Sequence, residues 1–225
     1  MKTSRKIVFI VIPLTILGIM FVVSLQSQHT ISLQSESESD KILSETNDFL
    51  SLNLPIIGYS DAPVTIIAFN DYQCKDCKTW YDEQYFEISK NLIETKKANI
   101  VFLDSISLGN DSVLISEATM CANDQEKYSQ YQEILFESQQ KIDDWAKSEQ
   151  LKKFAIDLEL DENMFELCLD SGKYENQVLS NIDYAKRYGV DKLPIFKIIN
   201  FEGKEHVLKG GISNDVFEDV VNQFQ

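Results

Sequence analysis

Histidine is nearly absent from this sequence. Only His29 and His206 occur among its 225 residues, which leaves little for a Ser-His-Asp triad or for a metal site built from several histidines. Basic residues are also scarce, with 21 lysines and arginines against 36 acidic residues and a formal charge of −15. This charge argues against sequence-independent nucleic-acid binding, which depends on cations that neutralise phosphates. No G-x-G-x-x-G motif or other phosphate-binding loop occurs. Four cysteines remain to be explained.

The longest uncharged apolar run lies near the N-terminus. Residues 7–25 carry no charge, and they follow three basic residues, Lys2, Arg5 and Lys6. As a helix this run is roughly 28 Å long, which matches the hydrocarbon core of a bilayer. We therefore expect residues 1–6 to be a cytoplasmic start and residues 7–25 a single transmembrane anchor, with the rest of the chain outside the cytoplasm. A cleaved signal peptide, which would leave a secreted protein, and a buried soluble helix are the alternatives.

A segment rich in serine and acidic residues follows the apolar run. Its centre is the low-complexity stretch Ser35-Glu36-Ser37-Glu38-Ser39-Asp40. A segment of this composition cannot bury enough apolar surface to fold. We therefore expect residues 26–50 to be a disordered acidic tether, and residues 51–225 to be the folded domain.

Strand and helix patterns alternate in the folded part. Short β-branched runs predict strands, and apolar residues that recur at intervals of three and four predict helices. Helical patterning dominates one long stretch, at about 111–188. The expected order is β-α-β, a helical insertion, then β-β-α, which is an α/β layer architecture. The strands are expected at 64–69, 99–103, 195–201 and 205–208, and the other helices at about 74–96 and 214–224.

A C-x-x-C motif lies where the first strand leads into the first helix. The N-terminus of a helix has unpaired N–H groups and a partial positive charge, and both stabilise a thiolate. We therefore expect Cys74 to have a lowered pKa and to be the nucleophile. Cys77 lies one turn further along and is within reach to close a disulfide. Between them, Lys75 favours the Cys74 thiolate and Asp76 opposes it, so both residues are expected to tune the redox properties.

Several separated segments match one known family in order and spacing. They are GYSDAPVTI (58–66), FNDYQC (69–74) with Cys77, FELCLDSGKY (165–174) and YGVDKLPIF (188–196). Together they resemble the DsbA-like thioredoxin-fold thiol-disulfide oxidoreductases, from Gly58 to the C-terminus. The resemblance implies a thioredoxin-like fold with a helical insertion. It also implies a redox-active disulfide between Cys74 and Cys77, with no metal and no separate cofactor.

The resemblance also assigns a role to the segment before the third expected strand. It implies that Pro194 is a cis-proline that faces the active-site disulfide, and cis bonds are accessible to X-Pro pairs. Leu193 would then bind an extended substrate through its main chain. The alternative is a proline that only opens a strand.

Two departures from the family pattern affect the redox chemistry. Strongly oxidising members usually have proline and a histidine or aromatic residue between the cysteines, where this chain has Lys75 and Asp76. Many relatives also carry an acid six residues before the first cysteine, which moves protons to and from the buried second thiol. This chain has Ala68 there. Asp71 or Asp76 is a candidate substitute proton acceptor.

Cys121 and Cys168 lie in the expected helical insertion. Similar proteins often pair cysteines at these places, and an even cysteine count is typical of proteins outside the cytoplasm. We therefore hypothesise a structural disulfide, which would contribute on the order of 4 kcal/mol in the chain-entropy model. The alternatives are two small buried apolar residues, or a Cys₄ zinc site, which usually needs two close cysteine pairs.

These features predict a membrane-tethered, extracytoplasmic thiol-disulfide oxidoreductase. Its substrates would be exported or unfolded proteins. The resemblance suggests re-oxidation by a quinone-linked membrane partner of the DsbB or vitamin K epoxide reductase type. A reductase or isomerase would use the same two cysteines in the opposite direction. A third alternative is a client-binding module without redox turnover.

Overall fold

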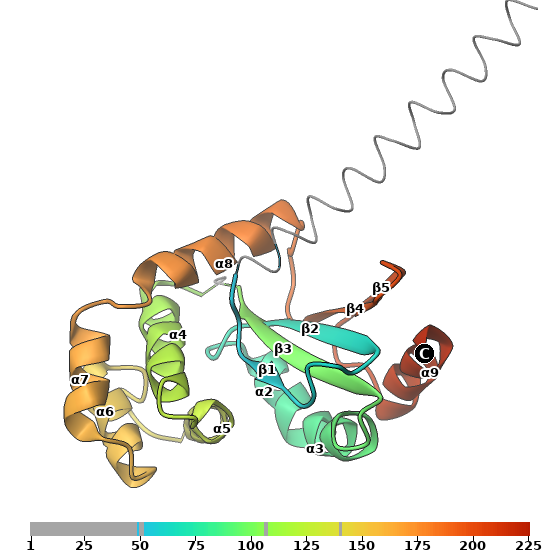
Figure 1. Ribbon diagram of the computed structural model, residues 1–225. Coiled ribbons are helices and arrows are strands. Elements are labelled where there is room, and N and C mark those ends of the chain that lie inside the picture. The colour runs from blue at the N-terminus through green and yellow to red at the C-terminus, as the bar shows by residue number, and fades with distance from the viewer. Residues whose placement is uncertain (1–48, 50–51, 106–107, 140) are drawn as a thin grey trace, which may run out of the picture. The chain divides into compact units, whose positions relative to one another are not determined.

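The strand Val64–Asn70 (β2) lies at the centre of a five-stranded sheet in this computed structural model (Figure 1). The structure describes residues 49, 52–105, 108–139 and 141–225. The expected anchor at 7–25 and nearly all of the expected tether lie outside these residues. Within the described part, no helix combines the length and apolar character needed to cross a membrane.

The sheet has the strand order β1-β3-β2-β4-β5. β2 is parallel to β3, and all the other neighbours are antiparallel. The parallel pair runs in register until Asn70 lies opposite Asp104, so both strands end at the same edge of the sheet. The other strands are Ile56–Ile57 (β1), Ala98–Asp104 (β3), Ile195–Asn200 (β4) and Glu205–Lys209 (β5). Four of the five strands are those expected from the sequence, and β1 was not expected.

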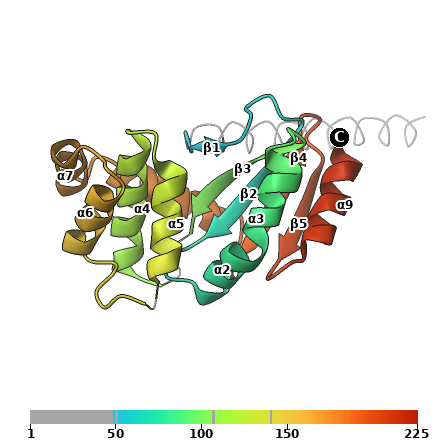
Figure 2. The same cartoon turned by 90° about the horizontal axis from the view of Figure 1, so that it is seen from below.

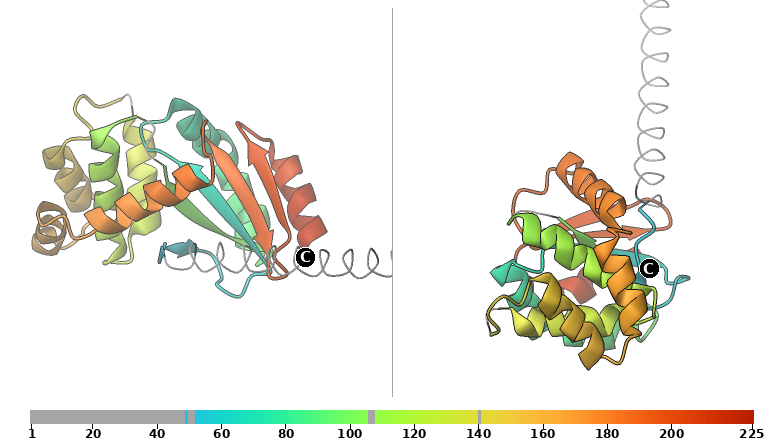
Figure 3. Two further views of the ribbon diagram at one scale, coloured as in Figure 1. Left: turned by 90° about the horizontal axis from the view of Figure 1, so that it is seen from above. Right: turned by 90° about the vertical axis from the view of Figure 1, so that its left-hand side faces the viewer.

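Alternate residues of β2 point into two different cores. Ile66 and Ala68 belong to a cluster with residues of α3 (Phe86–Ile88) and α9 (Asn214–Phe224), and Figure 2 shows these helices across one face of the sheet. Ile67 and Phe69 belong to a second cluster, which includes α8 (Glu175–Arg187) on the other face. The left panel of Figure 3 shows α8 in front of the strands. Because helices cover both faces, β2 is apolar along nearly its whole length.

The sequence pattern predicted one helix at about 74–96. The structure has a helical stretch there, but it is not one regular α-helix. It begins at Lys75, one residue after Cys74, and ends at Ile93. α-helical and π-helical turns alternate along it, and aromatic side chains from its first half pack on Phe102 of β3. The four segments are Lys75–Trp80 (α2), Tyr81–Tyr85 (η1), Phe86–Ile88 (α3) and Ser89–Ile93 (η2).

The helical insertion lies between β3 and β4, as expected. It consists of α4 to α8, and Figure 2 shows α4 to α7 beside the sheet. Its core is apolar, and a buried tyrosine also joins two of its helices, because the Tyr131 hydroxyl donates to the Leu151 carbonyl at 2.8 Å. The first four helices are Asn110–Asn123 (α4), Tyr128–Ser138 (α5), Ser148–Asp157 (α6) and Glu162–Asp170 (α7).

Candidate active site

Cys74 is the N-cap residue of α2. Its backbone is extended, with φ −75° and ψ 119°, and Lys75 begins the helix. The backbone N–H of Cys77 donates to the Cys74 sulfur over 3.1 Å. The sulfur therefore satisfies one of the N–H groups that a helix leaves unpaired in its first turn. The structure places both predicted redox cysteines at one helix N-terminus, with Cys77 one turn inside it.

The two thiols hold their protons differently. A hydrogen bond from the Cys77 thiol, helped by the backbone N–H groups of Cys77 and Asp76, lowers the pKa of Cys74, although burial and the charge of Asp71 oppose this shift. The same hydrogen bond and burial raise the pKa of Cys77. Negative charge is thus favoured on Cys74, while Cys77 keeps its proton. Cys74 is 8% exposed and Cys77 only 2%, so the thiolate is also the more accessible sulfur.

Asp71 fixes the loop that leads to Cys74. Its carboxylate accepts the backbone N–H of Gln73 at 2.7 Å, and the hydroxyl of Ser112 lies 2.9 and 3.1 Å from its two oxygens. Its carbonyl accepts the N–H of Cys74 at 3.0 Å. Of the two acids predicted as substitute proton acceptors, Asp71 is buried, whereas Asp76 is exposed.

Besides the contact of Ser112 with Asp71, two further polar side chains join the helical insertion to the active-site turn and α2. Gln139, the C-cap residue of α5, donates its amide to the carbonyl oxygens of Tyr72 at 2.5 Å and Cys74 at 3.1 Å. Lys78 of α2 donates to the carbonyl oxygen of Phe136 at 2.6 Å. The sequence analysis missed Gln139, because no motif marks a single glutamine at the end of a helical pattern.

The loop before β4 contributes to the buried core that contains the two predicted redox cysteines. The Leu193–Pro194 peptide bond is cis, as the resemblance implied. Leu193 belongs to the same buried cluster as Cys74 and Cys77. The Pro194 carbonyl accepts the N–H of Gly210 at 2.9 Å, which joins this loop to the end of β5.

A pocket of about 320 Å³ opens between α2 and the segment 210–213. Asp76 and Thr79 line it from α2, and Lys192 lines it from the loop before Pro194. Asp76 is exposed, so its charge faces the space beside the cis-proline loop.

Position 68 carries no acid, but a different buried acid lies nearby. Ala68 pairs with Phe102 on β3 and Phe196 on β4. Asp104, two residues after Phe102 on the same strand, is buried, and desolvation raises its pKa to about 7. The sequence analysis missed Asp104, because the strand expected at 99–103 ended one residue before it.

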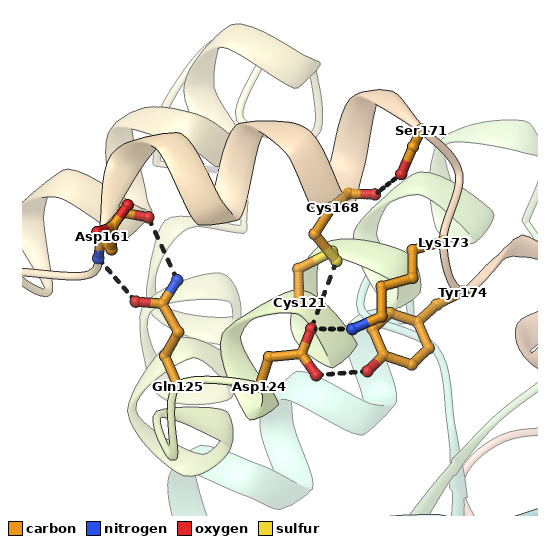
Figure 4. The surroundings of a disulfide bond; sticks show 8 residues. All are labelled: Cys121, Asp124, Gln125, Asp161, Cys168, Ser171, Lys173 and Tyr174. Carbon is orange, nitrogen blue, oxygen red and sulfur yellow. Dashed lines mark hydrogen bonds and ion pairs between the residues drawn. A yellow bond between two sulfur atoms is a disulfide. The ribbon is translucent and has the colours of Figure 1, made fainter.

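A disulfide joins Cys121 on α4 to Cys168 on α7 (Figure 4). This is the pair that the resemblance led us to expect. The Asp124 carboxylate lies 3.8 Å from the Cys168 sulfur and accepts hydrogen bonds from Lys173 and Tyr174, each at 2.6 Å. Because these two cysteines are bonded to each other, they do not contribute thiolates to a four-cysteine zinc site.

Sequence comparison relates the chain to disulfide-forming proteins. A thioredoxin family model matches residues 51–214, which is more than half of the chain. The chain is 25% identical over 143 residues to a probable disulfide bond formation protein D of Bacillus anthracis, covering 61% of this chain and 66% of that protein. It is 31% identical over 87 residues to disulfide bond formation protein D of Bacillus subtilis, covering 38% and 39%. The chain thus spans less than two thirds of the length of these relatives.

Solved structures with the same fold cover most of the described domain. BdbD from Bacillus subtilis in its oxidised form matches with a TM-score of 0.67 at 22% identity, covering 76% of this chain and 92% of that one. The thiol-disulfide exchange protein α-DsbA2 from Wolbachia pipientis matches with a TM-score of 0.68 at 20% identity, covering 83% and 95%. Identities this low support the fold alone. The family match shows that the chain belongs to the thioredoxin family, and its fold is that of BdbD and the DsbA proteins.

Proposed function

We propose that the protein is a protein-disulfide oxidoreductase whose redox-active pair is Cys74 and Cys77. The observation that carries this proposal is the hydrogen bond from the Cys77 N–H to the Cys74 sulfur at the start of α2. This geometry favours a thiolate at Cys74 and a protonated thiol at Cys77. Disulfide exchange needs this difference, because one sulfur must attack or leave as a thiolate while the other stays a protonated thiol.

The reaction moves two electrons from a substrate to the cysteine pair. A substrate thiolate attacks the Cys74 sulfur, the Cys74–Cys77 bond breaks, and Cys77 leaves as a thiolate that takes up a proton. A second substrate thiolate then attacks the substrate sulfur of the mixed disulfide and releases Cys74 as a thiolate. The substrate gains one disulfide, and the cysteine pair is reduced. The lowered pKa of Cys74 favours this direction, because it makes Cys74 the better leaving group.

The loop around the cis-proline is the proposed substrate-binding site. Leu193 lies in one buried cluster with the cysteines and is joined to Pro194 by a cis peptide bond, and an extended substrate would pair with the main chain of Leu193. Such pairing uses hydrogen bonds to the substrate backbone and depends little on the substrate side chains. It therefore suits many different unfolded chains. Lys75 and Asp76 are exposed beside this site, where their charges act on the bound chain and on the thiolate.

The proposed place of the reaction is outside the cytoplasm, on the membrane. The uncharged run at 7–25 behind a basic start supports a single-pass anchor with a cytoplasmic N-terminus. The Cys121–Cys168 disulfide supports an oxidising compartment, where such bonds persist. The substrates would then be exported proteins. A quinone-linked membrane protein of the DsbB or vitamin K epoxide reductase type would re-oxidise the pair.

Equilibration of the full-length protein with glutathione buffers tests this function. An oxidase should have a Cys74–Cys77 potential well above that of thioredoxin, which is about −270 mV. A potential as low as that of thioredoxin would instead support a reductase. Cys74→Ser should abolish the oxidation of a reduced, unfolded substrate. Client binding by a wild-type protein that shows no exchange would favour the binding-module alternative.

A further inference from the structure

A buried carboxyl group lies at the end of β3, at the edge of the sheet from which β2 leads to Cys74. Asp104 ends β3 and pairs in register with Asn70, the residue before Asp71. The N–H of Ser105 donates to the Asn70 carbonyl at 2.7 Å, which holds the ends of the two strands together. Because β2 and β3 are parallel, Asp104 lies beside the loop that leads to Cys74.

The surroundings of Asp104 do little to stabilise a charge. The side chain of Ser116 on α4 interacts with its carboxyl group and partly opposes the effect of burial on its pKa. Its Oδ1 atom, however, is buried and has no hydrogen-bond partner among the residues that the structure describes. Tyr72 from the redox loop and Tyr128 from α5 also face it, and burial holds the pKa of both phenols well above its ordinary value. Burial, together with the charge of Asp71, places the pKa of Asp104 at about 7, where a carboxyl can exchange a proton.

Asp71 connects Asp104 with the thiols. Its backbone N–H hydrogen-bonds to the Cys77 sulfur, and its charge acts on both Cys77 and Asp104. Ser112, whose hydroxyl binds the Asp71 carboxylate, is followed one turn later on α4 by Ser116. The Ser116 hydroxyl donates to the Ser112 carbonyl at 2.9 Å. One face of α4 therefore contacts both carboxyl groups.

Cys77 needs a proton acceptor inside the protein. Its side chain is 2% exposed, and its thiol has a raised pKa. A thiol in this position has to lose its proton before it can attack a disulfide. Ala68 offers no carboxyl for this purpose, and Asp76 is exposed. The buried acids beside the redox loop are Asp71 and Asp104.

We propose that Asp104 and Asp71 form one two-carboxyl site that holds the proton exchanged with the Cys77 sulfur. This inference rests on the proposed disulfide exchange and adds the proton path to it. When a substrate thiolate breaks the Cys74–Cys77 bond, the site gives its proton to the departing Cys77 thiolate and becomes ionised. On re-oxidation the Cys77 proton first returns to the ionised site. The Cys77 thiolate then attacks the Cys74 sulfur of the mixed disulfide between Cys74 and its partner, and the partner sulfur leaves as a thiolate. The sulfurs carry the electrons and the carboxyls only the proton, so Asp104 is a positioning residue that acts through Asp71.

Stopped-flow kinetics of the Cys77-dependent step test this proposal. The reduced full-length protein is mixed with oxidised glutathione, so that Cys74 forms a mixed disulfide and Cys77 then displaces glutathione. Across roughly pH 5–9, the wild-type rate of this second step should rise through about pH 7, where Asp104 ionises. Asp104→Asn should slow the step at neutral pH by about tenfold or more and remove this inflection. Asp104→Glu, which keeps a carboxyl, should restore most of the rate. Asp183→Asn, which changes an exposed acid on α8, is the matched control and should leave the rate unchanged.

A purely structural role for Asp104 predicts a different result. Alkylation of Cys74 by iodoacetamide needs only the Cys74 thiolate, so Asp104→Asn should change its rate by less than about twofold. An unaltered second step and pH profile in Asp104→Asn would overturn the inference. If this variant does not fold, the inference is tested by the infrared difference spectrum between oxidised and reduced wild-type protein. A protonated-carboxyl signal that is lost on reduction supports the site, and its absence overturns it. A wild-type protein that does not exchange with glutathione would overturn the proposed function instead.

Discussion

Gln139 donates its side-chain amide to the carbonyl oxygen of Cys74 over 3.1 Å, and also to the carbonyl oxygen of Tyr72. Gln139 closes α5, whereas Cys74 opens α2, so the contact joins the helical insertion to the redox turn. The insertion is thus part of the active-site framework as well as a cover for the sheet.

Gln139→Met should weaken this framework. The substitution keeps the size of the side chain but removes its donors, so the Tyr72 carbonyl loses this hydrogen bond and the Cys74 carbonyl keeps the one from the Lys78 N–H. We expect the free energy of unfolding to fall by about 1–3 kcal/mol, as measured by urea denaturation. Gln132→Met is the matched control. Gln132 is buried on the same helix, and neither of its amide atoms has a partner among the described residues. That substitution should be neutral or stabilising, and equal losses in both variants would contradict the assignment.

Cys77→Ala should raise the pKa of Cys74. The thiol of Cys77 is the first cause of the lowered pKa, and alanine removes this donor. A hydrogen bond to a charged group contributes about 1.5–3 kcal/mol, so alkylation of Cys74 near neutral pH should slow by about tenfold or more. The measurement is the rate of iodoacetamide reaction as a function of pH. Cys77→Ser keeps a hydroxyl donor and should stay closer to the wild type. An alanine variant that reacts as fast as the wild type would show that the helix N–H groups alone set the pKa.

Most of the fold could be predicted from the sequence, because the central strands are short, rich in β-branched residues and buried on both faces. β2 and β4 were found for this reason, and the bounds of α9 follow from its strongly amphipathic pattern. β1 was missed because it has only two residues and directly follows Pro55, so it exists only through its pairing with β3. Local pattern alone cannot supply such a partner.

Only those residues of the candidate site that belong to a sequence motif could be predicted. Cys74 and Cys77 are marked by their spacing, and Pro194 by the family resemblance. Asp104 carries no motif, and its burial depends on the packing of surrounding elements, among which Ser116 of α4 and Tyr128 of α5 interact with it. Its raised pKa is therefore a tertiary property, which no local pattern predicts.

Replacing both Cys121 and Cys168 by alanine should destabilise the insertion without stopping exchange at Cys74. The disulfide connects residues 47 positions apart, and a loop of this size corresponds to about 4 kcal/mol in the chain-entropy model. Urea denaturation should show this loss, while the glutathione equilibrium of the other pair is retained. Asp124→Asn is the control beside the same bond. Its ion pair with Lys173 is partly exposed, so that loss should stay below about 1 kcal/mol. Equal losses in both proteins would contradict a structural role for the disulfide.

Asp104→Asn should stabilise the protein at high pH, although we expect it to slow exchange. A carboxyl in the unfolded chain has a pKa of about 3.9, and burial raises that of Asp104 to about 7 in the folded protein. Between these values the folded state binds more protons than the unfolded state, so the free energy of unfolding falls as the pH rises. Above about pH 7 the folded wild type holds a buried charge that costs a few kcal/mol, whereas asparagine is neutral at every pH. Urea denaturation should therefore show similar stability of variant and wild type near about pH 4, and a more stable variant near about pH 8. Asp183→Asn should show no such change with pH. A constant difference between Asp104→Asn and the wild type at both pH values would mean that Asp104 does not titrate in the folded protein.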